Sequence, residues 1–179
     1  IVTKGGDVVN VAPSDVRIET YVRGRNLDAI LDASAKVDRA FKAGGDAVGA
    51  GTTITHVPGY LPIFQDRNLT AIAGRNGRTL LGDRGALEAG FMGGSFDVGD
   101  LSHLLPVVHP MVTGTRGYLH TADFCITDYE AAVVLPAKLM AMCVIDLLAD
   151  GGAEARRVKK EFQPRLTKGQ YLELMQRLS

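Results

Sequence analysis

The sequence contains no tryptophan, only two cysteines and no excess of either charge. Lysine and arginine together number 20, as do aspartate and glutamate, so the chain lacks the basic field that attracts nucleic acid or anionic lipid. Aromatic residues make up 6% of the chain, which leaves few rings on which bases could stack. We therefore expect neither a nucleic-acid partner nor a membrane partner.

The cysteines, Cys125 and Cys143, are too few for a disulfide framework and lack the CxxC spacing of metal sites. We expect both to be reduced thiols in a cytoplasmic protein. No apolar run approaches the roughly 20 residues that span a bilayer, and no charged-then-apolar leader precedes Ile1. The chain opens inside a predicted strand without a methionine, which is typical of a fragment.

The rigid connector at 58–62 (PGYLP) is the best candidate for a domain boundary. Before it, Asn26 is expected to cap a helix that ends at Gly44 and Gly45. Short β-prone pieces at 1–3 and 8–11 flank a turn at 4–7, and alternating residues predict strands at 16–23 and 51–57. The resulting β-β-α-β order is typical of part of an open-faced α+β sandwich.

After the connector, the pattern predicts an α/β unit that contains both short strands and apolar helices. A helix at 66–75, a strand at 78–81 and a buried strand at 104–112 come first. A core helix at 128–150, with Pro136 in its first turn, and helices at 153–162 and 168–178 follow.

The stretch 90–124 holds glycine pairs, two close aspartates and three of the four histidines, so it is interpreted as site loops. Within it, His120 follows the predicted buried strand and is the candidate metal ligand. The alternative is a hydrogen-bonded structural histidine. His103 and His109 are interpreted as packing residues.

Two further pairs of polar residues have both a functional and an ordinary interpretation. Asp97 and Asp100 could face one pocket and take part in proton transfer or orient a metal ligand, or could form an Asx turn and a helix cap. Asn10 and Arg23, expected on successive strands, could hold a carbonyl or a carboxylate. Surface arginines on strands are also ordinary.

Together these motifs resemble the M20 family of metallo-amidohydrolases and peptidases, in the branch of aminobenzoyl-glutamate hydrolase and related N-acyl amino-acid amidohydrolases. Residues 4–23 are similar to the family's lid signature, in which an arginine follows the asparagine of Asn-Val-x-Pro by thirteen residues, as Arg23 follows Asn10. Residues 93–102 (GGSFDVGDLS) are similar to its glycine-Ser/Thr-Asp loop. Leu119-His120-Thr121 is similar to its late metal-binding histidine.

The resemblance implies a fold in two parts, with 1–58 the later part of a ferredoxin-like lid and dimerisation domain. Residues 63–179 would be the C-terminal part of a zinc-peptidase-like α/β catalytic domain. The implied activity is hydrolysis of an N-acyl amino acid or peptide-like substrate by water activated on two divalent metal ions, Zn, Mn or Co, in a homodimer. His120 would bind one metal, and Asn10, Arg23 and Asp97 would contact substrate.

The family's other metal ligands and its general base lie upstream of the resembling stretch and have no counterpart in these 179 residues. The resemblance therefore implies no catalytic residue in this chain, which should be inactive alone although its longer parent should be an enzyme. The competing hypothesis is a non-catalytic dimerisation or binding module that retains the lid without the chemistry.

Overall fold

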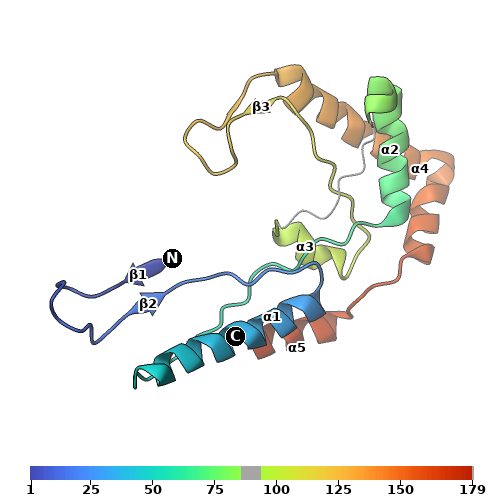
Figure 1. The fold of residues 1–179 in the computed structure, drawn as a ribbon. Helices are drawn as coiled ribbons and strands as arrows, with labels where there is room; N and C mark the ends of the chain where they lie inside the picture. Colours follow the sequence, from blue (N-terminus) through green and yellow to red (C-terminus); the bar gives the residue numbers. More distant parts are fainter. Residues whose placement is uncertain (86–93, 179) are drawn as a thin grey trace. The chain divides into compact units, whose positions relative to one another are not determined.

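The computed structural model describes residues 1–85 and 94–178, and the chain divides into two compact units (Figure 1). The first unit contains Ile1–Thr55 and the second contains His56–Ser179. Most of the described chain is helical and its strands are short. This agrees with a mixed α+β class, while the domain identities above remain predictions.

The first unit begins with a hairpin in which β1 (Val2–Lys4) pairs antiparallel with β2 (Arg17–Ile18). Between the strands, the Asp15 carboxylate lies 3.0 Å from Lys4 Nζ and 2.9 Å from an Arg17 guanidinium nitrogen. Hydrogen bonds from Arg17 and then from Lys4 lower the pKa of Asp15. The carboxylate therefore ties the two strands together across their connecting loop.

This sheet is shorter than the alternation of apolar residues predicts. Residues 8–11 and 51–57 are irregular, and only two residues of 16–23 form a strand. The predicted β-β-α-β order is thus wrong in its last strand, because the unit shows β-β-α. An alternating segment becomes a strand only beside a partner that supplies N–H and C=O groups, and the described residues offer 8–11 and 51–57 no such partner.

Helix α1 (Leu27–Ala47) follows the hairpin. The predicted cap is confirmed, because the Asn26 side chain accepts a hydrogen bond of 2.9 Å from Ala29 N. The predicted end at the glycine pair is wrong, since α1 continues to Ala47. Gly45 instead makes room for the returning chain: a Cβ there would lie 2.1 Å from Thr52 Oγ1.

In the second unit, α2 (Arg67–Leu81) begins at Asp66, whose side chain accepts a hydrogen bond from Leu69 N. The helix continues through Gly74 and Gly77 to Gly82, so the strand predicted at 78–81 is wrong. Gly77 is buried within α2, so it serves packing rather than helix termination. A 3₁₀ turn, η1 (Gly82–Gly85), follows.

A π-helical turn, η2 (Glu130–Val134), leads into α4 (Leu135–Glu161). Pro136 lies in the first turn of α4, as predicted. The helix is broken at Ala149–Gly152, where Asp150 and the two glycines after it have positive φ. The two helices predicted at 128–150 and 153–162 therefore correspond to the two halves of α4, and α5 (Lys168–Leu178) follows as predicted.

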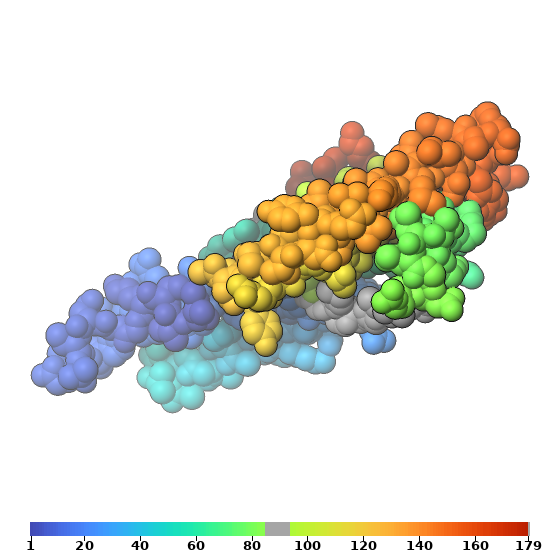
Figure 2. Space-filling view, turned by 90° about the horizontal axis from the view of Figure 1, so that it is seen from above, coloured from blue at the N-terminus to red at the C-terminus, as the bar shows by residue number. Residues whose placement is uncertain are grey.

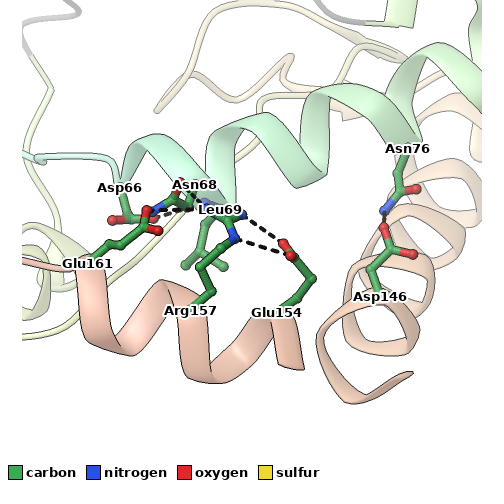
Figure 3. A network of polar contacts seen from close by, with 8 residues as sticks. All are labelled: Asp66, Asn68, Leu69, Asn76, Asp146, Glu154, Arg157 and Glu161. Atoms are coloured by element: carbon green, nitrogen blue, oxygen red, sulfur yellow. Dashed lines mark hydrogen bonds and ion pairs between the residues drawn. The ribbon is translucent and has the colours of Figure 1, made fainter. Parts of the chain in front are cut away.

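Polar side chains join α2 to α4 (Figure 3). The buried Asn76 donates a hydrogen bond of 3.0 Å to Asp146 Oδ2. Near the start of α2, the Arg157 guanidinium donates to Asn68 Oδ1 at 2.8 Å and to the Glu154 carboxylate at 2.7 Å. The bonds to Asn76 and Asn68 hold α4 against α2, and the hydrogen bond from Arg157 lowers the pKa of Glu154.

The first half of α4 is not the buried core helix that its sequence predicts. Val158, in the second half, is the buried residue that the structure shows in α4. The first half, orange in Figure 2, lies at the surface, and its exposed apolar residues, with those of η2, are Val133, Val134, Met140, Val144, Ile145 and Leu148. An apolar helix needs an apolar partner to become a core helix, and α2 covers one face of α4.

Within the described residues, the stretch Glu130–Glu161 is long and apolar enough to cross a membrane, judged by length and composition alone. By this measure the expectation that no apolar run approaches the length of a membrane span is wrong, although Lys138 and Asp146 interrupt the apolar sequence. Asp146 is held by Asn76 of α2. The absence of a membrane partner remains a prediction.

Candidate functional site

Helix α3 (Asp97–Ser102) is clamped against the segment that precedes α2. Asp100 Oδ1 accepts a hydrogen bond of 2.8 Å from Leu61 N, and Ser102 Oγ accepts one of 2.9 Å from Phe64 N. The backbones come so close that a Cβ on Gly99 would lie 1.9 Å from Leu61 O. Asp100, Ser102 and Gly99 of α3 therefore have a structural role, because they hold the segment before α2 in place.

His103 extends the same clamp. Its ring Nε2 lies 3.0 Å from Pro62 O, and its carbonyl accepts hydrogen bonds from Arg165 N and Leu166 N. Only 6% of the residue is exposed. This agrees with the interpretation of His103 as a packing residue and rules it out as an accessible ligand.

The two aspartates of the loop have different surroundings, which corrects the hypothesis that they share one pocket. Asp100 lies inside α3, where it binds Leu61 and Tyr171. Burial raises the pKa of Tyr171, and the nearby Asp100 raises it further. Asp97, at the start of α3, is exposed, and its carboxylate accepts from the adjacent Val98 N. Asp97 alone remains a candidate for contact with substrate.

The predicted buried strand at 104–112 is irregular. Val107 O accepts a hydrogen bond from Asp66 N, and His109 N donates one of 2.9 Å to Gln65 Oε1. These are single contacts with the segment before α2 rather than a ladder. The described residues provide no neighbouring strand for this segment, so an apolar run that would suit a sheet interior stays irregular.

His120 lies at the tip of a hairpin in which β3 (Thr115–Arg116) pairs antiparallel with β4 (Cys125–Ile126). Its side chain is exposed, and its φ of 67° places it in the left-handed region. That conformation costs an L-residue roughly 1 kcal/mol or more, so the surrounding loop must impose it.

The loop around His120 supplies this constraint. The Thr121 hydroxyl bridges Tyr118 O and the Asp123 carboxylate. Gly117 has a φ of 86°, and a Cβ there would lie 2.7 Å from Asp123 O. The chain is thus held tightly on both sides of the exposed imidazole.

Asn10 and Arg23 belong to the first unit, whereas Asp97 and His120 belong to the second. The expectation that Asn10 and Arg23 lie on strands is wrong: Asn10 is in an exposed turn and Arg23 in an irregular segment after β2. The Arg23 guanidinium lies 5.4 Å from the centre of the Tyr21 ring. A shallow hollow of about 190 Å³ in the hairpin loop is lined by 5–9 and contains none of these four residues.

The part of the chain that the structure describes contains no group of three or more His, Cys, Asp or Glu side chains that could hold a metal ion. His120 therefore supplies one ligand at most, and a metal centre normally needs three or four protein ligands. The donor set of the described residues does not fit a two-metal centre by itself. The glycines predicted at 90–93 as part of the site loop lie outside the described residues.

Phe96 was not singled out from the sequence, and His109, which was interpreted as a packing residue, does pack against its ring. The centres of their rings are 4.6 Å apart, with the ring planes inclined at 43°. Phe96 lies immediately before Asp97, and this position was the only hint of a role for it in the sequence. It could not predict the contact with His109, because the two residues are thirteen positions apart in the chain.

No family model matches the chain, and no curated protein or solved structure is significantly similar to it. The resemblance to the M20 family therefore depends on the sequence motifs alone.

Proposed function

We propose that this chain is the C-terminal portion of an M20-type metallo-amidohydrolase, whose substrates are N-acyl amino acids or short peptide-like amides. The observation that carries the proposal is the presentation of His120. Its imidazole is exposed in a strained backbone conformation that the loop imposes, and strained residues of this kind cluster at active sites and ligand clamps. The order of the motifs around Asn10, Arg23 and Asp97 supports the same assignment.

In this proposal Arg23 and Asn10 hold the substrate's carboxylate and amide, because a guanidinium fork and a side-chain amide match those groups. Asp97 faces the substrate from the start of α3. A divalent metal, held by His120 together with ligands from outside this chain, would lower the pKa of bound water. Because the described residues supply one ligand, the chain by itself should be inactive.

We also propose that the parent protein is a homodimer, formed through the first unit. The hairpin of β1 and β2 is two-stranded, and all of its strand residues except the half-buried Lys4 are exposed. An unpaired strand edge is a template for pairing with another strand. A non-catalytic dimerisation module would share this edge but would bind no metal, so metal content separates the two hypotheses.

The proposal is tested by the hydrolysis of N-acyl amino acids by the longer protein, and Arg23 provides the sharper prediction. Because a carboxylate clamp acts in both ground and transition states, Arg23→Ala should mainly raise KM. The expected loss is roughly 1.5 to 3 kcal/mol, as for a hydrogen bond to a charged group. A substrate with its carboxylate amidated should lose a similar amount with the unaltered enzyme, and steady-state kinetics measures both.

Arg25→Ala is the matched control, since Arg25 is also exposed and only two residues away. It should leave KM close to that of the unaltered enzyme. The clamp is excluded if Arg23→Ala still discriminates between free and amidated substrates as well as the unaltered enzyme does.

A further inference from the structure

The chain contains one Asn-Gly pair, Asn76-Gly77, and one Asp-Gly pair, Asp150-Gly151. In such a pair the glycine nitrogen can attack the side-chain carbonyl carbon of the preceding residue and close a five-membered succinimide ring. Glycine favours this step because it has no Cβ to shield its nitrogen or to restrict rotation of the backbone. From the sequence alone the asparagine pair is the more reactive, since at neutral pH an aspartate is ionised and its carboxylate resists attack.

The structure protects the asparagine pair. Asn76 is 6% exposed and lies within α2, and the adjacent Gly77 is also buried. The Asn76 side-chain nitrogen donates a hydrogen bond of 3.0 Å to Asp146 Oδ2 (Figure 3). Ring closure there requires the backbone to leave its helical conformation and α2 to separate from α4, so the reaction must wait for local unfolding.

The aspartate pair lies in the break within α4. Asp150 and Gly151 are both exposed, and their φ angles are 50° and 65°. The left-handed conformation is unfavourable for an aspartate but not for a glycine. Rotation of the Asp150 backbone toward ring closure therefore gives up no favourable helical conformation. Among residues 1–85 and 94–178, no group binds the Asp150 carboxylate and holds it away from the Gly151 nitrogen.

We propose that Asp150 is a site of spontaneous isoaspartate formation, an inference that does not depend on the function proposed above. The Gly151 nitrogen bonds to Cγ of the protonated Asp150 side chain, and the Cγ hydroxyl leaves as water with the proton of that nitrogen. Water then opens the ring at either carbonyl carbon. Opening at Cγ restores aspartate, whereas opening at the main-chain carbonyl carbon leaves the Gly151 nitrogen bonded to Cγ, which is the isoaspartyl linkage.

The linkage falls between two contacts that hold α4 to α2. Asp146 accepts a hydrogen bond from Asn76 before the break, and Arg157 donates one to Asn68 after it. An isoaspartyl residue adds one carbon atom to the main chain. The modification therefore alters the spacing between the two halves of α4.

The variant Asp150→Asn provides the sharpest test, because it places the same Asn-Gly chemistry at two positions of one chain. Asparagine tolerates the left-handed region, so the break should be preserved. Under native conditions near neutral pH, peptide mapping should show deamidation at position 150 at least about tenfold faster than at Asn76. That factor corresponds to about 1.4 kcal/mol of local opening. In urea the two rates should become similar, and equal rates under native conditions would overturn the inference.

The unaltered chain gives the second measurement. After prolonged incubation under native conditions, digestion with a protease that cuts before aspartate but not before isoaspartate should show a growing uncut fraction at Asp150. Asp7 is the matched control, because it is also exposed and outside a helix but is followed by the β-branched Val8. Asp7 should stay cleavable, and an uncut fraction at Asp150 no larger than that at Asp7 would contradict the proposal.

Discussion

Replacing His120 with alanine in the full-length parent should reduce amidase activity by orders of magnitude and leave the thermal unfolding of the metal-free protein almost unchanged. The loss is expected because an imidazole ligand is removed, which empties or loosens one metal position. The fold should survive because the side chain is exposed and its φ of 67° is set by the surrounding loop. Steady-state kinetics and calorimetry measure the two effects.

His120→Gly distinguishes the effect of losing the imidazole from the effect of the backbone conformation. Glycine adopts positive φ without a steric cost, so this variant should be at least as stable as the unaltered protein and just as inactive as His120→Ala. Tyr118→Ala is the matched control, since it removes an exposed side chain of the same loop and should keep activity. An active His120→Gly enzyme would show that His120 is not a metal ligand.

The largest effect on stability is expected from Gly99→Ala. The added methyl group would lie 1.9 Å from Leu61 O and 3.0 Å from Leu61 C, so α3 or the segment before α2 must move. That movement would break the hydrogen bonds from Leu61 N to Asp100 and from Phe64 N to Ser102. We expect a loss of about 3 kcal/mol or more, from overpacking together with broken hydrogen bonds, measurable by denaturant unfolding.

Gly169→Ala is the appropriate comparison, because Gly169 lies in α5 of the same unit and a Cβ there meets no atom within 4 Å. Alanine is favoured over glycine in a helix by up to about 1 kcal/mol, so this variant should be neutral or more stable. A Gly99→Ala protein as stable as Gly169→Ala would mean that α3 does not pack against Leu61 as the structure shows.

Helices were predictable from the sequence because their signals are local. The side chain of Asn26 caps α1 through a residue three positions away, and Pro136 lies in the first turn of α4. The predicted end of α1 at the glycine pair failed, since Gly45 accommodates neighbouring chain, and α2 continues beyond its predicted end at 75. Strands failed more widely, because a strand at 51–57 or 104–112 needs a partner that local sequence does not specify.

The sequence shows which polar residues could form a site, but not how they are arranged. Spacing suggested that Asp97 and Asp100 act together, yet Asp100 is used to hold Leu61 N while Asp97 stays exposed. The contact between His109 and Phe96 could not be read from the sequence, because it depends on the path of the intervening chain. The left-handed conformation of His120 is likewise a property of its loop rather than of a motif.

The central claim is that this chain supplies one ligand of a two-metal site, and zinc stoichiometry tests it most directly. After dialysis against a weak chelator, the 179-residue chain should retain no zinc, because one imidazole binds no more tightly than an ordinary surface histidine. The longer parent, with its upstream ligands, should retain two equivalents. Stoichiometric zinc on the 179-residue chain, or none on the parent, would contradict the account.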